Sequence, residues 1–242
     1  APLEAVDELD VSYVSNISQF GDPDVVIIPG SKNTISDLLW MRQNGLEGKI
    51  LRHAAKGGIV FGICGGYQML GQSISDPTGA EQKGTVRGMG LLPVTTVFEQ
   101  EKRRTRVSGR FAKVGGALAE MSGVCYEGYE IHMGRTVLSK GTVPLVYMEE
   151  EGEQRQDGAQ SDHVYGCYMH GIFDMSETVK TFLAAVLRKK GIDPSKITVR
   201  DRNAYKEEQY DRLASIVREN LNMEAVYKII EKGNEASCSL LS

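Results

Sequence analysis

The sequence has few cysteines and histidines for its length, and those it has are scattered. Its 242 residues contain four cysteines and four histidines, and no two cysteines form a Cys-x-x-Cys pair. Without paired cysteines, or histidines at ligand spacing, neither a structural zinc site nor a disulfide framework is predicted. We therefore predict no metal ion in this chain.

The chain also lacks a long apolar run and a strong charge imbalance. No stretch approaches the roughly 20 apolar residues that a transmembrane helix needs, and no signal peptide opens the sequence. The 28 basic and 32 acidic residues give a net charge of −4, which argues against a polyanion-binding surface. We expect a cytoplasmic protein that binds neither membrane nor nucleic acid.

What the sequence does have is a glycine-rich turn with a cysteine at its tip. Residues 59–71 read Ile-Val-Phe-Gly-Ile-Cys-Gly-Gly-Tyr-Gln-Met-Leu-Gly, so an apolar, strand-like run stops at Cys64 and helical spacing follows. A nucleophile at the top of an α/β sheet needs a sharp, crowded turn, and therefore small residues on both sides of it. Gly62, Gly65 and Gly66 meet this need. Because a cysteine that only fills space would require none of them, the pattern predicts a nucleophile elbow.

Cys64 needs partners to become a nucleophile. The helix after the elbow directs N–H groups and the positive end of its dipole at the sulfur, which favours the thiolate and can hold an oxyanion. A base should come from another strand end near the elbow. His170 follows a predicted strand over 164–169 and fits this requirement, whereas His132 competes for the role.

The pattern along the chain predicts an α/β fold. Strands are predicted at 11–14 and 24–28, and a helix over 34–55 that is interrupted near Gly45, before the elbow strand. Another helix is predicted over 177–190. Alternating strands and helices predict a mostly parallel central sheet with helices on both faces.

The middle of the chain has a different pattern, with short β-like runs separated by glycine between residues 84 and 146. Runs at 90–98, 106–114 and 129–133 would extend the sheet or form an antiparallel flank. The charged segment 149–161 is predicted to be a hairpin tip or an exposed loop whose charges face solvent.

The C-terminal part is predicted to be helical. Residues 200–232 show amphipathic spacing, with Leu213 and Ile216 on the apolar stripe. We predict one domain over 1–195 and a helical extension over 196–242, which packs on that domain or docks against a domain outside this chain.

Four motifs in order carry a resemblance to a known family. They are Pro-Gly-Ser-Lys-Asn-Thr at 29–34, the elbow segment at 62–71, Tyr-Glu-Ile-His-Met-Gly-Arg-Thr at 129–136 and His-Gly-Ile-Phe-Asp at 170–174. Together they resemble the class I, triad-type glutamine amidotransferases, in the cobyric acid synthase and cobyrinic acid diamide synthase branch. The resemblance covers residues from about 10 to 190 and implies a flavodoxin-like fold.

The resemblance implies a reaction for the elbow. Cys64 would attack the side-chain amide of glutamine, giving a γ-glutamyl thioester and ammonia, with His170 acting as base toward the thiol and then as acid toward ammonia. Backbone N–H groups of Gly65 and of the Gly30–Ser31 loop would hold the tetrahedral oxyanion.

The resemblance also implies residues that bind the substrate. Gln68, four residues after the nucleophile, would help to hold glutamine, and Arg106 would bind its α-carboxylate. Arg103 and Arg104 are close to Arg106 in the sequence and compete for that assignment.

One departure from the wider class concerns the third catalytic residue. Many class I members carry His-Pro-Glu, in which the acid orients the histidine, but Ile172 occupies that position here. This suggests a Cys-His dyad, or help from Glu130 or Asp174.

The second departure concerns ATP. No Gly-x-x-x-x-Gly-Lys-[Ser/Thr] motif is present, so no P-loop is predicted and no cofactor is expected in this domain. The resemblance implies an N-terminal synthetase domain, absent from this chain, which would bind ATP and magnesium. That domain would use the ammonia to amidate carboxylates of the corrinoid adenosylcobyrinic acid a,c-diamide.

Two other functions fit the motifs less well. The glutaminase subunit that amidates a peptidoglycan lipid precursor has a similar Gly-Ile-Cys-Gly-Gly-Tyr-Gln core, but the segment at 129–136 favours the cobalamin branch. A non-catalytic relative that acts as a binding module would be expected to lose Cys64 or His170, and this chain keeps both.

Overall fold

The computed structural model describes residues 2–6, 9–150, 153–197, 199 and 202–238. The chain divides into two compact units, Ala1–Val199 and Arg200–Ser242, which are described separately. None of the helices in these described ranges is long and apolar enough to cross a membrane.

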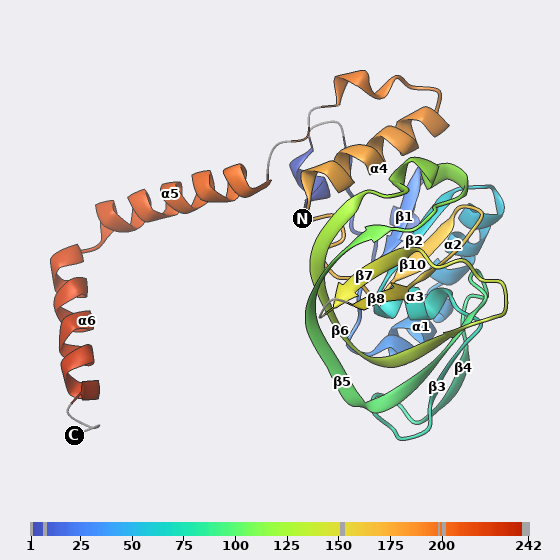
Figure 1. Ribbon diagram of the computed structural model, residues 1–242, viewed down its shortest axis with the longest axis horizontal. Helices are drawn as coiled ribbons and strands as arrows, with labels where there is room; N and C mark the ends of the chain where they lie inside the picture. The colour runs from blue at the N-terminus through green and yellow to red at the C-terminus, as the bar shows by residue number, and fades with distance from the viewer. Residues whose placement is uncertain (1, 7–8, 151–152, 198, 200–201, 239–242) are drawn as a thin grey trace. The chain divides into compact units, whose positions relative to one another are not determined.

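A small, mainly parallel sheet carries the elbow. Its strand order is β1 (Val25–Ile28), β2 (Ile59–Ile63), β10 (Val164–Cys167) and β9 (Ala159–Ser161), and only the edge strand β9 is antiparallel (Figure 1). The carboxyl ends of β1, β2 and β10 therefore meet at one edge, where open α/β sheets place their ligand sites. The predicted strand at 24–28 and the elbow strand are both present.

Four α-helices lie among the described residues of the first unit. The predicted helix over 34–55 is present as α1 (Thr34–Gln43) and α2 (Leu46–Ala55), and Gly45 lies between them with a φ of 77°. This left-handed conformation costs glycine little, which explains the break. The helix after the elbow is α3 (Gly65–Leu70), and the predicted helix over 177–190 is α4 (Ser176–Lys189).

Strand β2 is buried on both faces. Ile59 and Phe61 pack with the inner side chains of α4 on one face, and Val60 packs with those of α1, α2 and α3 on the other. Successive side chains of a strand point to opposite faces, so an almost continuous apolar strand fits a sheet with helices on both sides. The predicted fold class is confirmed in this part of the molecule.

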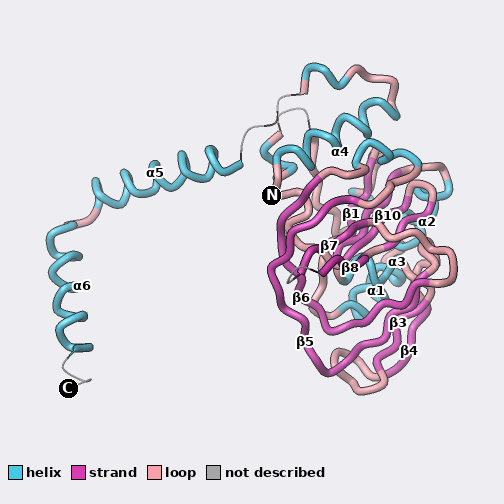
Figure 2. Tube along the Cα trace, viewed as in Figure 1, coloured by secondary structure: helices cyan, strands magenta, loops and turns pink. Residues whose placement is uncertain are grey.

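A second sheet contains the long strands of the middle segment. Figure 2 shows β5 and β6 running side by side as one long ribbon, which fits their antiparallel register. The strand order is β4, β3, β5, β7 and β8, with β6 paired to β5 off this path. The predicted antiparallel flank is thus a sheet of its own. The bounds are β3 Ser73–Asp76, β4 Gly84–Arg87, β5 Val94–Phe111, β6 Cys125–Leu138, β7 Val146–Glu150 and β8 Glu153–Asp157.

Glycines do not interrupt these strands as the sequence predicts. The runs at 90–98 and 106–114 belong largely to one strand, β5, that continues through Gly109. A Cβ atom built on Gly109 would lie 2.1 Å from the carbonyl oxygen of Tyr147, so this glycine permits close approach of the neighbouring strand β7.

The predicted strand at 11–14 is wrong. These residues form no strand, and the side chain of Tyr13 is 75% exposed. Asn16 and Gln19 instead cap the short 3-10 helix Ile17–Gln19 with their side chains. Such local hydrogen bonds compete with strand pairing. The remaining 3-10 helices are Leu3–Ala5, Gly116–Met121 and Pro194–Lys196.

The prediction of a hairpin tip or exposed loop at 149–161, with its charges facing solvent, is confirmed only in part: Glu149 and Glu153 are exposed on a hairpin, but other charged groups are not. Strands β7 and β8 form an antiparallel pair, and Asp157 at the end of β8 is only 7% exposed. The tip at 151–152 lies outside the described residues. Arg155 turns inward because a buried carboxylate, Glu130, lies within ion-pair distance.

The second unit is helical, as predicted. It contains α5 (Arg202–Asn220) and α6 (Met223–Cys238). Several apolar side chains on both helices are exposed, among them Leu213, Ile216 and Ile229. The surface against which this unit docks stays a prediction.

Candidate active site

Three chain segments converge at the carboxyl ends of the parallel strands. The N–H of Cys64 donates to the carbonyl oxygen of Cys167 at 2.9 Å, which links the ends of β2 and β10. The N–H of Gly66 donates to the carbonyl oxygen of Pro29 at 3.1 Å, which links the start of α3 to the loop after β1. The elbow, the Pro29–Thr34 loop and the segment leading to His170 are therefore neighbours.

The backbone at Cys64 has the strained geometry predicted for an elbow. Its φ of 53° and ψ of −110° are rare for a residue with a side chain, and it directly precedes α3. A Cβ on Gly66 would lie 2.0 Å from the carbonyl oxygen of Ile28, and one on Gly62 would lie 2.7 Å from the nitrogen of Tyr67. The flanking glycines are thus required by backbone crowding.

The thiol of Cys64 is buried and protonated at neutral pH. Burial raises its pKa to about 11, and the hydrogen bond from the N–H of Gly65 offsets only part of this effect. The sulfur donates to the carbonyl oxygen of Ile131 at a distance of 3.6 Å. The helix end was expected to favour the thiolate, but desolvation outweighs it, so deprotonation requires a base.

His170 lies beside Cys64. A Cβ built on Gly30 would lie 2.8 Å from Cε1 of His170 and 3.6 Å from Cβ of Cys64, so both side chains border the same small volume. The imidazole stacks on Tyr129, with ring centroids 5.0 Å apart and an interplanar angle of 6°. Its Nε2 atom is buried and has no hydrogen-bond partner among the described residues.

The protonation state of His170 suits a base. Burial lowers the pKa of its imidazole below 6.5, and the nearby His132 lowers it further. The ring is therefore neutral at pH 7 and can accept a proton.

His132, the competing histidine, is held in other contacts. Its Nδ1 atom lies 2.8 Å from the carbonyl oxygen of Gly134, and its Nε2 atom lies 3.5 Å from a carboxylate oxygen of Glu130. Its ring stacks on Tyr168 at a centroid distance of 3.7 Å. Both nitrogens of His132 therefore face Gly134 and Glu130, whereas Nε2 of His170 has no such partner among the described residues.

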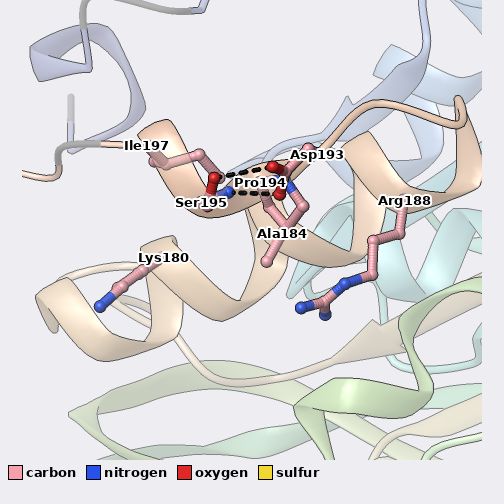
Figure 3. A pocket seen from close by; sticks show the side chains of 7 residues that line it. All are labelled: Lys180, Ala184, Arg188, Asp193, Pro194, Ser195 and Ile197. Atoms are coloured by element: carbon pink, nitrogen blue, oxygen red, sulfur yellow. Dashed lines mark hydrogen bonds between the residues drawn. The ribbon is translucent and has the colours of Figure 1, made fainter.

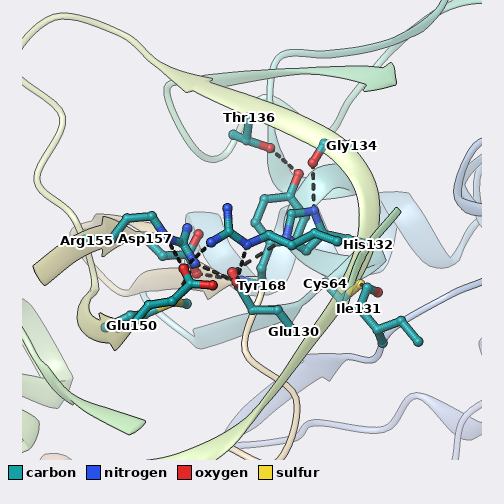
Figure 4. A network of polar contacts seen from close by, with 12 residues as sticks. Cys64, Glu130, Ile131, His132, Gly134, Thr136, Glu150, Arg155, Asp157 and Tyr168 are labelled. Carbon is teal, nitrogen blue, oxygen red and sulfur yellow. Dashed lines mark hydrogen bonds and ion pairs between the residues drawn. The ribbon is translucent and has the colours of Figure 1, made fainter. Parts of the chain in front are cut away.

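Glu130 is the centre of a buried ionic network (Figure 4). Its side chain is fully buried and lies 2.5 Å from Arg155 and 3.0 Å from Arg103. Burial alone would raise the pKa of Glu130, but hydrogen bonds from His132 and Arg155, together with their charges, lower it to about 2. The predicted role of Glu130 in orienting an imidazole applies geometrically to His132.

Asp157 lies near Glu130, but its pKa is shifted in the opposite direction. Burial and the negative charge of Glu130 raise its pKa to about 6. Its Oδ2 atom accepts a hydrogen bond from the N–H of Tyr168 at 2.8 Å. Asp157 therefore connects the charged hairpin to the segment that leads into His170.

The predicted oxyanion residues are adjacent. A Cβ on Gly65 would lie 2.8 Å from the backbone nitrogen of Ser31, so the backbones after β1 and β2 touch at this point. The hydroxyl of Ser31 donates to Asp37 and accepts from the N–H of Asn33. The side chain of Ser31 is thus directed to its own loop.

Gln68 is buried beneath the elbow. Its Oε1 atom accepts from the hydroxyl of Thr34 at 3.2 Å, and its Nε2 atom donates to the hydroxyl of Tyr168 at 3.1 Å. The latter hydroxyl also contacts Thr136 at 2.6 Å. Both ends of the Gln68 amide are therefore engaged with the protein.

The candidate arginines at 103, 104 and 106 on β5 differ in their environment. Arg103 forms ion pairs with Glu130 and Glu150. Arg106 is exposed and is paired in register with Tyr129, the residue that stacks on His170. Since Arg103 is already neutralised, Arg106 is a better candidate than Arg103 for a substrate carboxylate, and Arg104 is exposed as well.

Comparison with known proteins identifies the family. The family model of the CobB/CobQ-like glutamine amidotransferase domain matches residues 1–178. The chain belongs to this family. The resemblance inferred from the four motifs is thereby confirmed, and the chain is a glutamine amidotransferase domain.

Curated relatives extend the match along the chain. Cobyric acid synthase of Ruminiclostridium cellulolyticum is 51% identical over 237 residues, which cover 96% of this chain and 46% of that protein. Cobyric acid synthase of Lachnoclostridium phytofermentans is 42% identical over 241 residues, which cover 96% of this chain and 47% of that protein. The chain spans about half the length of the curated relatives it matches.

Solved structures support the fold of this amidotransferase domain. A crystal structure of a glutamine amidotransferase matches with a TM-score of 0.50 and 14% identity, covering 76% of this chain and 88% of the other. The structure of PurLQS from Thermotoga maritima matches with a TM-score of 0.53 and 18% identity, covering 74% and 85%. At these identities the likeness concerns the fold alone.

Within the described ranges, no group of three or more histidine, cysteine, aspartate or glutamate side chains could hold a metal ion. A pocket of about 340 Å³ lies along α4 and the 3-10 helix Pro194–Lys196 (Figure 3). None of the candidate catalytic residues lines it. Its lining residues are Lys180, Ala184, Arg188, Asp193, Pro194, Ser195 and Ile197.

Sequence reasoning missed three residues near the elbow. Tyr129 stacks on His170, Thr34 contacts Gln68, and Glu81 contacts Thr34. Thr34 and Tyr129 lie in quoted motifs but were given no role. Glu81 ends the stretch Asp-Pro-Thr-Gly-Ala-Glu, and a proline and glycine after a strand end were the available signal of a loop at the site.

Proposed function

We propose that this domain hydrolyses glutamine through a covalent Cys64 thioester and releases ammonia for a synthetase. The observation that supports this most is that Cys64 and His170 both border the space next to Gly30. A strained cysteine next to a neutral, half-buried imidazole is the arrangement needed for a thiol activated by a general base.

In the first step, His170 takes the proton of the Cys64 thiol while the sulfur attacks the side-chain carbonyl carbon of glutamine. The resulting tetrahedral oxyanion receives hydrogen bonds from the N–H groups of Gly65 and of the Gly30–Ser31 loop. When the intermediate collapses, the C–N bond breaks and the imidazolium of His170 donates its proton to the leaving nitrogen. The products are ammonia and a γ-glutamyl thioester.

In the second step, water attacks the thioester carbonyl and His170 takes a proton from that water. The C–S bond breaks, the thiolate of Cys64 leaves and recovers the proton, and glutamate is released. Gln68 and Arg106 are proposed to hold glutamine, Arg106 through the α-carboxylate. Two charge-assisted hydrogen bonds from one guanidinium would suit this group.

The ammonia is proposed to serve ATP-dependent amidation of carboxylates on adenosylcobyrinic acid a,c-diamide. Two facts support this. The curated relatives cited above are named cobyric acid synthase, and the chain spans about half of their length. A synthetase domain in the remaining half would bind ATP, magnesium and the corrinoid.

Covalent labelling tests the proposal directly. We expect 6-diazo-5-oxo-L-norleucine, an electrophilic glutamine analogue, to add to Cys64, as detected by peptide mass spectrometry. Cys64→Ala should abolish labelling and glutamine hydrolysis, and His170→Ala should slow both strongly. Cys125→Ser is the matched control because Cys125 is an exposed thiol away from the elbow. Labelling at Cys125 but not at Cys64 in folded protein would contradict the proposal.

A further inference from the structure

The loop after β3 places the carboxylate of Glu81 close to the elbow. Asp76 is fully buried at the end of β3, and its two carboxylate oxygens accept four backbone N–H groups at 2.8–2.9 Å. Four such bonds fix the loop that follows. The donors are Gly79, Ala80, Glu81 and Gln82. The loop thereby holds the backbone of Glu81 in place.

The side chain of Glu81 reaches the elbow through Thr34. Its Oε1 atom lies 3.3 Å from the hydroxyl of Thr34, which also contacts Gln68. That hydroxyl would lie 3.1 Å from a Cβ on Gly65, the residue after the nucleophile. The negative charge of Glu81 is among those that act on the Cys64 thiol.

The second oxygen of the Glu81 carboxylate has no hydrogen-bond partner among the described residues. Oε2 of Glu81 is buried and has no hydrogen-bond partner among the residues that the structure describes, and no ion pair to Glu81 occurs among them. Burial raises the pKa of Glu81, although the N–H groups of Ile35 and Thr34 offset part of the effect. A buried carboxylate oxygen without a hydrogen bond is costly, so Oε2 retains the capacity to accept a further donor.

We infer that the carboxylate of Glu81 binds the α-ammonium group of the glutamine substrate. The inference rests on the proposed function, because it assumes that the amide end of glutamine faces Cys64. An ammonium group provides both the positive charge and the N–H donors that Oε2 lacks. A divalent cation fits less well, since it would require several oxygen ligands and Glu81 is the one carboxylate in this cluster with Thr34 and Gln68.

This assignment predicts the specificity of the site. The site would accept free glutamine and reject glutamine whose α-nitrogen is acylated, as in a peptide or an N-acetyl derivative. Acylation removes the charge and leaves the carboxylate of Glu81 buried without a partner.

The test compares two electrophiles that differ only at the α-nitrogen. The full chain is treated with 6-diazo-5-oxo-L-norleucine or with its N-acetyl derivative, and the rate of Cys64 labelling is followed by mass spectrometry. We expect Glu81→Gln to slow labelling by the free amino acid about tenfold or more, the effect of losing one charge-assisted hydrogen bond. Labelling by the N-acetyl derivative and by iodoacetamide should not be slowed, because the negative charge of Glu81 raises the pKa of the Cys64 thiol and its loss favours the thiolate.

Glu99→Gln is the matched control, because Glu99 is an exposed carboxylate paired with Arg135 on β5. Equal labelling of Glu81→Gln and wild type by the free amino acid would overturn the inference. Equally slowed labelling by all three reagents would also overturn it, because Glu81 would then act only by positioning the elbow. If iodoacetamide labels wild-type Cys64 but neither diazo compound does, the proposed function itself fails, and the inference with it.

Discussion

The thiol of Cys64 donates a hydrogen bond to the carbonyl oxygen of Ile131, with the sulfur 3.6 Å from the oxygen. Cys64 directly follows strand β2 of the mainly parallel sheet, whereas Ile131 belongs to β6 of the mainly antiparallel second sheet. The nucleophile therefore lies where the two sheets meet, and the antiparallel sheet forms one wall of the site. For catalysis the thiol must leave this carbonyl and turn its proton to His170.

The pH dependence of the reaction is expected to report His170. Because burial lowers the pKa of its imidazole, the base form persists below pH 6.5. Labelling of Cys64 by the glutamine analogue should be constant near neutral pH and fall only as His170 becomes protonated. Rates measured between about pH 5 and 8 should show a midpoint below that of an ordinary histidine. In His170→Gln this acid limb should disappear, and a wild-type midpoint above 7 would contradict the assignment.

Relief of strain at the elbow should be measurable as stability. Cys64→Gly removes the side chain from a backbone conformation that only glycine adopts easily, while Cys64→Ala keeps the strain. Strain of about 1–3 kcal/mol exceeds the entropic cost of glycine, about 0.5–1 kcal/mol, so we expect the glycine variant to be the more stable by about 1 kcal/mol. Urea unfolding of both inactive variants checks this. A more stable alanine variant would show that the turn is not strained.

Asp157 should make stability depend on pH in the acidic range. Its pKa is raised from 3.8 to about 6 in the folded protein, so the folded state holds this proton more tightly than the unfolded chain. The contribution of Asp157 is therefore greatest below pH 3.8 and is lost as the pH rises to about 6, by about 3 kcal/mol in total.

Replacement of Asp157 by asparagine removes this titration. The free energy of unfolding of Asp157→Asn, relative to wild type, should increase between about pH 4 and 6 and then stay constant. Glu153→Gln is the control because Glu153 is exposed at the other end of β8. If both variants show the same pH dependence relative to wild type, Asp157 titrates normally in the folded protein.

Two glycine-to-alanine substitutions should have opposite effects. In Gly66→Ala the new Cβ would lie 2.0 Å from the carbonyl oxygen of Ile28, so the backbone of the elbow must shift. We expect a loss of about 3 kcal/mol or a failure to fold. Gly48, within α2, has open space at its Cβ position, and Gly48→Ala should stabilise the protein by up to about 1 kcal/mol. Thermal unfolding measures both, and similar melting temperatures would refute the crowding argument.

The elbow could be predicted from sequence because its motif is local. An apolar run, three glycines and one cysteine lie within ten residues, so the motif can be seen in the sequence. The turn itself excludes a side chain at Gly62, whereas the backbone of Ile28 and Ser31 excludes one at Gly66 and Gly65. The break at Gly45 was predictable for the same reason. By contrast, the strand predicted at 11–14 failed because strand formation depends on a partner, and local capping by Asn16 took precedence.

The charged hairpin shows why the rest of the site could not be predicted. Glu150, Arg155 and Asp157 look like a solvated run in the sequence, yet they join Glu130 from a different strand in a buried network. Whether a charge is buried depends on what lies opposite it across the sheet, and pairings between β6, β7 and β8 are long-range. Glu81 was missed for the same reason, since its neighbours Thr34 and Gln68 come from other elements.

The sequence by itself determined the family and the elbow with Cys64 at its tip, because these depend on motifs within short segments of the chain. Only the tertiary structure decided that His170 borders the elbow while His132 contacts Gly134 and Glu130, that Arg103 is paired with acidic groups, and that the thiol is protonated at neutral pH. Those properties depend on burial and on distances between groups far apart in the chain. Burial and such distances exist only once the two sheets have packed together.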